Sequence, residues 1–339
     1  MTAMNSLPTL DEVARIAGVS RATASRAING GSRVSATAQR AVEDAVRSLG
    51  YVPNPAARSL VTRRTDSVAV IVPEPDERVF SDPFFAGTLR GVNRVLASRD
   101  LQLVLLLATP GAQGQRTLRY LSRGHVDGAV VVSHHKHDGL ADHLAAIGLP
   151  CVFVGRPWNG AERVMYVDVD NVAGGREATR LLVDRGATRI GTVAGPADMT
   201  AAVDRLQGWQ EAMAVARLAS DAIVFGDFTE ASGEAAARDL LDRHPDLDGI
   251  AVASDLMAAG ALRVLADSGR RVPDDVAVVG YDDLGVAERT SPPLTTVRQP
   301  IVEMAERATR LLLEQMDGSA PPGAMRVIIP PTIVRRDSA

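Results

Sequence analysis

From Val68 onward, short apolar runs alternate with segments of helical length, and this alternation limits the possible folds more than any other feature of the sequence. Near-continuous apolar strands separated by helices predict parallel sheets that helices cover on both faces. Because about 270 residues are long for one such sheet, we expect two lobes. The runs are 68–72, 101–107, 128–132, 151–154, 190–194, 249–252 and 276–279.

A short internal repeat supports two lobes. Residues 127–133 and 248–254 share the pattern D-G-x-x-V-x-S. Each copy is a predicted strand that ends on a serine, Ser133 or Ser254, where open α/β sheets place their ligand contacts. Chance similarity between two buried strands remains the alternative.

The first 64 residues form a basic segment in an otherwise acidic chain. They carry nine arginines and four acidic residues, a balance of +5, whereas the whole chain has a formal net charge of −4. The remainder therefore carries −9. A small basic head on a larger acidic body is typical of a polyanion-binding domain joined to a domain that does not bind polyanions.

The head has the signals of three short helices. Thr9 and Glu12 form a capping box that begins the first helix, Ser20 caps the second, and Gly50 ends the third. The tight turn at 17–20 joins the first two helices. Two helices joined in this way, with a third that closes a small core, predict a helix-turn-helix unit.

The second helix carries side chains that suit DNA. An arginine near the start of a recognition helix, here Arg21, can pair with guanine O6 and N7 in the major groove. Thr23, Ser25 and Asn29 are short polar residues that suit phosphate contacts. A purely structural helical hairpin is the alternative. The predicted DNA-binding residues are Thr9, Ser20, Arg21, Ala22, Thr23, Ser25, Arg26, Asn29, Arg33, Ser35, Tyr51, Asn54, Ala57 and Leu60.

Several protein classes are disfavoured. No apolar run reaches the roughly 18 residues of a membrane span, and the N-terminal segment lacks the basic and apolar parts of a secretory signal. Cys151 is the single cysteine, which excludes an internal disulfide framework. No G-x-S-x-G, Walker or G-x-G-x-x-G motif follows a suitable strand. We therefore expect a soluble cytoplasmic protein that is not an enzyme and has no cofactor.

The histidine-rich segment 134–138 does not predict a metal site. Adjacent histidines in a loop do not converge on one ion without a further ligand from elsewhere, and no cysteine cluster supplies one. We expect no metal, and a solvated loop at the mouth of a cleft.

The chain resembles the LacI/GalR (lactose-repressor/galactose-repressor) family of transcription regulators over essentially its full length. One departure is Ala24, where the family commonly has valine, and its effect on packing should be slight. The matching motifs are V-A-x-x-A-G-V-S-x-x-T-x-S-R-x-x-N at 13–29, Y-x-P-N-x-A-A-R-S-L at 51–60, and the segments 82–85, 169–171, 194–196, 205–209, 280–283 and 293–299.

The resemblance explains the segment after Pro53. Asn54 and Pro55 begin a predicted helix of about six residues, which is too short to be stable alone in water. In the family this hinge helix forms only on operator DNA, beside its twin from the second subunit. The side chain that matches Leu60 then wedges into the minor groove. An ordinary linker is the alternative reading.

The resemblance also implies a homodimer that binds double-stranded operator DNA with pseudo-palindromic half-sites. No leucine heptad follows the last strand-like segment, 325–334, so we expect a dimer rather than a tetramer. The body resembles periplasmic sugar-binding proteins, with two lobes, three crossover segments and a cleft for a sugar or a nucleoside.

By motif, Arg205 and Asp282 are the main polar ligand contacts, and the aromatic residues provide walls. Some relatives carry asparagine where this chain has Ser133 or Ser254. The predicted effector-binding residues are Phe84, Phe85, Ser133, Arg156, Arg205, Phe228, Ser254 and Asp282.

The predicted fold class is an all-α helix-turn-helix head with a two-lobed α/β body of parallel sheets. We expect a ligand-controlled repressor, and the alternative is a solute-binding protein of a transport system, which the helix-turn-helix head argues against. The expected divisions are a head at 1–52, a hinge helix and linker at 53–66, and a body at 67–339, with one lobe at 67–168 and 300–326 and the other at 169–297 and 327–339.

Overall fold

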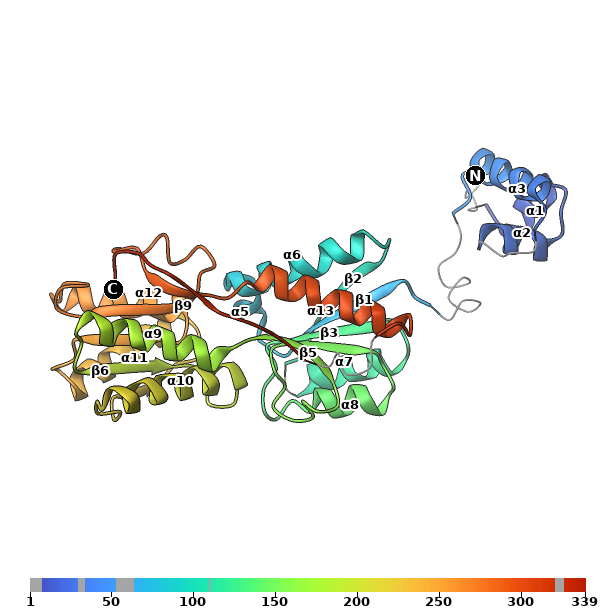
Figure 1. Ribbon diagram of the computed structural model, residues 1–339. Helices are drawn as coiled ribbons and strands as arrows, with labels where there is room; N and C mark the ends of the chain where they lie inside the picture. The colour runs from blue at the N-terminus through green and yellow to red at the C-terminus, as the bar shows by residue number, and fades with distance from the viewer. Residues whose placement is uncertain (1–7, 30–33, 53–63, 110, 321–325) are drawn as a thin grey trace. The chain divides into compact units, whose positions relative to one another are not determined.

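The computed structural model describes residues 8–29, 34–52, 64–109, 111–320 and 326–339. It divides the chain into two units, Met1–Thr65 and Asp66–Ala339, which are called the head and the body below (Figure 1).

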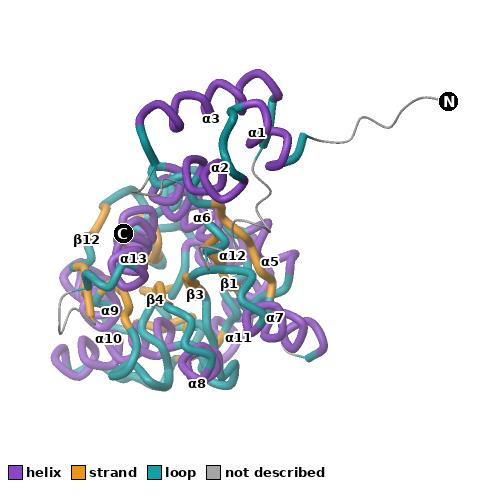
Figure 2. The backbone as a smooth tube through the Cα atoms, turned by 90° about the vertical axis from the view of Figure 1, so that its right-hand side faces the viewer, coloured by secondary structure: helices purple, strands orange, loops and turns teal. Residues whose placement is uncertain are grey.

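The described residues of the head form the three helices labelled in Figure 2, which enclose a small core. The predicted capping box begins α1, since the Thr9 backbone N–H donates to Glu12 Oε2 at 2.7 Å and the Glu12 N–H donates to Thr9 Oγ1 at 3.3 Å. The Ser20 side chain caps α2 by accepting from the Thr23 N–H at 3.1 Å, and Gly50 ends α3 with a φ of 60°. The helices are α1 (Leu10–Ile16), α2 (Arg21–Ile28) and α3 (Ala36–Leu49), and the core residues are Val13, Ala14, Ala24, Ala27, Val42 and Ala45.

The first lobe of the body is a six-stranded sheet with the order β11-β5-β4-β3-β1-β2, and all its strand pairs are parallel. Helices α6 (Pro83–Ala97) and α13 (Ile301–Met316) cover one face of the sheet, and α7 (Ala112–Ser122) and α8 (Leu140–Ala146) cover the other. The strands are β1 (Ser67–Val72), β2 (Gln102–Leu107), β3 (Gly128–Val132), β4 (Cys151–Val154), β5 (Met165–Val169) and β11 (Arg326–Ile329).

The second lobe repeats this arrangement in a sheet with the order β12-β10-β9-β8-β6-β7. Its strand pairs are parallel except for β12, which runs antiparallel to β10. Helices α11 (Glu230–Arg243) and α12 (Asp255–Asp267) cover one face, and α9 (Asn171–Arg185) and α10 (Thr200–Ala216) cover the other. The strands are β6 (Ile190–Ala194), β7 (Ile223–Phe225), β8 (Gly249–Val252), β9 (Ala277–Asp282), β10 (Thr295–Arg298) and β12 (Thr332–Val334).

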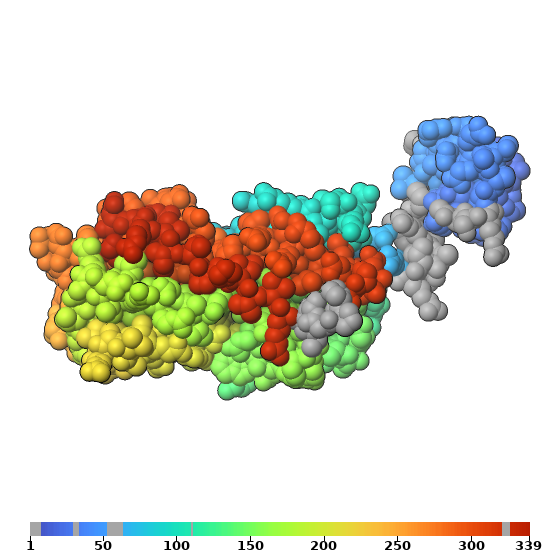
Figure 3. Space-filling model, in the orientation of Figure 1, coloured from blue at the N-terminus to red at the C-terminus, as the bar shows by residue number. Residues whose placement is uncertain are grey.

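The chain passes between the lobes three times, and the third passage corrects an expected boundary. The segment 325–334 was predicted as one strand that belongs to the second lobe from residue 327. The structure instead keeps β11 in the first sheet to Ile329 and begins β12 in the second sheet at Thr332. Pro330 and Pro331 lack the backbone N–H that a continuous strand needs, so the chain crosses there. Figure 3 shows this C-terminal segment, in red, running over both lobes of the body.

The two sheets and their covering helices confirm the predicted fold class. In the part of the chain that the structure describes, no helix is both long enough and apolar enough to cross a membrane.

Helices α9 and α10 approach each other closely at two glycines. A Cβ atom on Gly208 would lie 2.1 Å from the Val172 carbonyl oxygen, and one on Gly175 would lie 2.2 Å from the Arg205 carbonyl oxygen. The neighbouring atoms are backbone, so they cannot rotate away. The absence of side chains at these positions therefore sets where Arg205 lies.

We expect Gly208→Ala to lower the free energy of unfolding of the body by about 1–3 kcal/mol, because overpacking outweighs the roughly 1 kcal/mol that alanine gains in a helix. Urea denaturation measures the change. Gln210→Ala, on the exposed side of α10, is the control and should have little effect. Equal stability of Gly208→Ala and the wild type would show that the helices can separate at no cost.

Candidate nucleic-acid interface and ligand pocket

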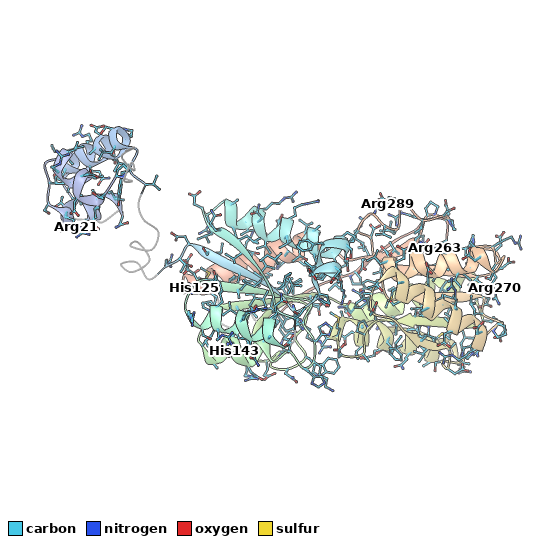
Figure 4. The ribbon with its side chains drawn as sticks, turned by 180° about the vertical axis from the view of Figure 1, so that it is seen from behind. Arg21, His125, His143, Arg263, Arg270 and Arg289 are labelled. Atoms are coloured by element: carbon cyan, nitrogen blue, oxygen red, sulfur yellow. The ribbon has the colours of Figure 1, made fainter. Side chains whose placement is uncertain are left out.

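The outer side of α2 in the head carries exposed basic residues. Arg21 and Arg26 are both exposed, as is Ala22 between them, and Figure 4 shows Arg21 at the surface of the head. Arg21 Nε lies 3.4 Å from Asp11 Oδ1, with both side chains about 70% exposed. An exposed ion pair of this kind contributes little, so Arg21 remains available to a nucleic acid.

Several predicted DNA contacts also build the head. The side chains of Thr9, Ser20 and Ser35 are N-caps of the three helices. Tyr51 packs partly buried against the core. Thr23 and Ser25 are half-buried and Asn29 is exposed. Outside the described residues lie the predicted contacts Arg33, Asn54, Ala57 and Leu60, together with the predicted hinge helix.

The body holds a pocket that is open to solvent and lined by residues of both lobes. It lies where strands of both sheets end, the position that open α/β sheets use for ligands. The structure brings six of the eight predicted effector-binding residues to this pocket: Phe84, Ser133, Arg205, Phe228, Ser254 and Asp282.

The guanidinium of Arg205, on α10, is buried and held by acceptors from three other segments. Nε donates to Asn171 Oδ1 at 2.9 Å, Nη1 to the Ala253 carbonyl at 2.5 Å, and Nη2 to Gln299 Oε1 at 2.8 Å. Its Cζ lies 3.6 Å from the centroid of the Tyr281 ring. A side chain held on every side needs no reordering when a ligand binds.

Asp282 lies at the end of β9, where Arg205 Nη1 approaches its Oδ1 at 3.4 Å. Burial raises the pKa of Asp282 to about 7, although the Arg205 charge opposes the rise, and Asp82 from the first lobe adds to it. The carboxyl therefore changes protonation near neutral pH, and it can accept or donate a hydrogen bond to a ligand.

Glu74, after β1, binds two residues that line the pocket and one residue of the histidine-rich loop. It is 3% exposed, and its Oε1 accepts from Arg78 Nη1 at 2.8 Å, Ser133 Oγ at 2.6 Å and His135 Nε2 at 3.0 Å. Burial opposes ionisation, but the His135 hydrogen bond, the Arg78 charge and the Ser133 hydrogen bond hold the pKa of Glu74 below its usual value. Glu74 is therefore a buried carboxylate with its own set of donors.

The histidine-rich loop differs from the solvated loop that was predicted. His134 is buried, and burial lowers its pKa. His135 lies between Glu74 and Asp198 of the second lobe, which is 2.9 Å from Nδ1. The hydrogen bond to Glu74 raises the pKa of His135. The loop therefore links the two lobes, because carboxylates from both reach the same imidazole.

Two predicted effector contacts do not line the pocket. Phe85 is buried in the core of the first lobe and meets Phe84 edge-on at 5.3 Å. Consecutive helical residues point about 100° apart, so only Phe84 of this pair faces the cleft. Arg156 instead bridges the lobes, since its Nη2 lies 2.6 and 2.7 Å from the two carboxylate oxygens of Asp204.

Sequence reasoning missed other residues of the pocket. Arg78 follows the first strand of the body, as does its partner Glu74, which does not itself line the pocket, and Asp168 lies near the end of β5. Their place after strand ends was a usable signal, because that edge of the sheet carries ligands. The missed residues that line the pocket include Arg78, Asp82, His134, Asp168, Thr200 and Gln299.

Comparison with known proteins identifies both parts of the chain. The family model described as "Bacterial regulatory proteins, lacI family" matches residues 9–54, and the "Periplasmic binding protein-like domain" matches 179–339. The HTH-type transcriptional regulator CelR of Thermobifida fusca is 50% identical over 314 residues, which is 92% of each chain.

Solved structures show the same similarity. A CelR–cellobiose complex matches with a TM-score of 0.79 at 46% identity, over 98% of this chain and 100% of the other. A lac repressor dimer bound to operator and the anti-inducer ONPF matches with a TM-score of 0.85 at 26% identity, over 98% of each chain.

The raised pKa of Asp282 can be tested directly. In the ¹³C carboxyl spectrum of the wild type we expect Asp282 to titrate near pH 7. In the Arg205→Met variant we expect Asp282 to titrate at a higher pH, because the mutation removes the positive charge that favours the carboxylate. Asp221, whose pKa the Arg189 hydrogen bond lowers to about 2, is the internal control and should not change. Titration of Asp282 near pH 4 in the wild type would contradict the burial argument.

Proposed function

The chain belongs to the LacI family of bacterial regulatory proteins, and we propose that it is a transcriptional repressor whose effector is a β-linked glucose disaccharide of the cellobiose type. It is a DNA-binding regulator and not an enzyme or a transport protein, as the relatives are HTH-type regulators over nearly the full length of both chains. Because operator DNA lies in the bacterial cytoplasm, the proposed function places the chain there.

The observation that carries the choice of effector is the 46% identity to a regulator solved with cellobiose, together with a pocket whose chemistry suits a sugar. A sugar offers hydroxyl groups that donate and accept, which the carboxyl of Asp282 and the buried guanidinium of Arg205 can satisfy. It also offers apolar C–H faces, and Phe84 and Phe228 supply aromatic surface in the same pocket.

We propose the same division of roles for the predicted residues. The exposed side of α2 would read operator bases, with Arg21 on a guanine, and the body would bind the effector through Arg205 and Asp282. A lac repressor dimer with the same fold is bound to operator, and we expect this chain to bind as a dimer to two half-sites about one helical turn apart.

Calorimetric titration of the full-length protein tests the effector. We expect cellobiose to bind and to raise the melting temperature, with little effect from galactose or adenosine. Arg205→Ala should lose binding by about 1.5–3 kcal/mol or more, because it removes a charged hydrogen-bond donor from the pocket. Arg180→Ala, on the exposed side of α9, is the matched control. Binding of adenosine but not of cellobiose would show that the effector is a nucleoside and not a sugar.

Operator affinity measured with and without cellobiose tests the coupling. A ligand that changes operator affinity must itself bind differently in the presence of operator, by the same factor. An unchanged operator affinity at saturating cellobiose would contradict the proposal that cellobiose regulates operator binding.

Arg21→Ala should cost about 1–3 kcal/mol of operator binding and relax base preference at one symmetric position of the half-sites. Arg47→Ala removes the same charge from α3, where Arg47 pairs with Asp44, and serves as the control. Competition binding against operators with single-base changes measures both variants. A uniform loss at every sequence would make Arg21 a phosphate contact.

A further inference from the structure

Arg78 enters the ligand pocket from the first lobe, on the short helix α5 (Asp76–Ser81). Its Nη1 donates to the buried carboxylate of Glu74 at 2.8 Å, and its side chain is 14% exposed. The guanidinium also contacts the ring of Phe228 from the second lobe, whose centroid lies 5.5 Å from Arg78 Cζ. Glu74 and Phe228 therefore hold the guanidinium at the boundary between the lobes.

Arg78 has donors that the protein does not use. A guanidinium carries five N–H groups, and the Nε–H of Arg78 is buried without a partner among the described residues. Buried polar groups in native proteins are almost always paired, and an unpaired one is costly. Arg205 differs at the same atom, since its Nε–H donates to Asn171 Oδ1 at 2.9 Å.

Charge in the pocket limits the kind of acceptor that Arg78 can meet. Glu74 already compensates the positive charge of Arg78, and the pocket also contains Asp82, Asp168 and Asp282. Arg205 is the other cationic side chain of the lining. A phosphate group would add a charge of about −1.5 to −2 beside these carboxyl groups. Hydroxyl and ring oxygens accept hydrogen bonds without adding charge.

We propose that Arg78 is a specificity-determining contact that donates from the first lobe to an oxygen of an uncharged sugar, and that the pocket rejects the phosphorylated form of the same sugar. This inference rests on the proposed function, because it concerns the same pocket and the same class of effector. Burial already raises the pKa of Asp168 to about 6 and that of Asp282 to about 7. A further anion in the pocket would raise these pKa values again, so its binding at neutral pH would have to overcome carboxylate repulsion or take up protons.

Calorimetry with cellobiose and a set of its monodeoxy derivatives tests the contact. We expect Arg78→Met to bind cellobiose about 10- to 100-fold more weakly than the wild type, which is the cost of a lost charged hydrogen bond. Removal of one particular hydroxyl should weaken binding to the wild type and have no effect on binding to Arg78→Met. Arg116→Met, at an exposed position of α7, is the matched control and should bind like the wild type.

The deoxy series separates a contact from a general loss of structure. A variant that is only distorted would lose affinity for every sugar and would keep the penalty of every missing hydroxyl. That pattern overturns the inference, as does unchanged affinity of Arg78→Met. If the wild type binds no sugar, the proposed function fails as well, whereas normal binding by Arg78→Met refutes the role of Arg78 alone.

Cellobiose 6′-phosphate tests the charge argument. We expect the wild type to bind it at least about 10-fold more weakly than cellobiose, through repulsion by the pocket carboxylates. Equal or tighter binding of the phosphorylated sugar would overturn the proposal that the pocket selects an uncharged ligand.

Discussion

The buried guanidinium of Arg205 is the interaction on which the second lobe and its pocket depend. A charge taken out of water is stable only if hydrogen-bond acceptors surround it. The acceptors come from Asn171 at the start of α9, Ala253 after β8, and Gln299 between β10 and α13. Gln299 lies on the segment that crosses from β10 to α13 of the first lobe. Its hydrogen bond to Arg205 therefore also fixes the start of this connection between the lobes.

The contacts between the lobes surround the pocket and have complementary charges. Arg156 of the first lobe meets Asp204 of the second, and His135 meets Asp198. The Lys136 N–H also donates to the Asp198 carbonyl at 2.9 Å. Each contact depends on the distance between the lobes, so a ligand between them and the contacts around it respond to the same movement.

The sequence predicted the helices of the head and seven strands of the two sheets because caps, breakers and apolar runs act over a few residues. It did not predict β5, β7 and β10, and it merged β11 and β12 into one segment. It predicted Arg205 and Asp282 through motifs shared with a family. It failed for Phe85 because a motif does not say which of two adjacent aromatic side chains faces a cleft. It failed for Arg156 and Glu74 because their partners, Asp204 and His135, lie 48 and 61 residues away, and the sequence does not give that proximity.

A ligand shifts an equilibrium between arrangements of the lobes only by as much as its affinity for them differs. A ligand that touched Arg205 and Asp282 alone would bind one lobe and favour no arrangement. A ligand that also contacts Arg78 binds both lobes, because Arg78 belongs to the first lobe and contacts Phe228 of the second. A sugar long enough to reach both lobes gains its full set of hydrogen bonds in one arrangement only. Under the proposed function, an effector that contacts both lobes would therefore regulate operator binding as well as bind in the pocket.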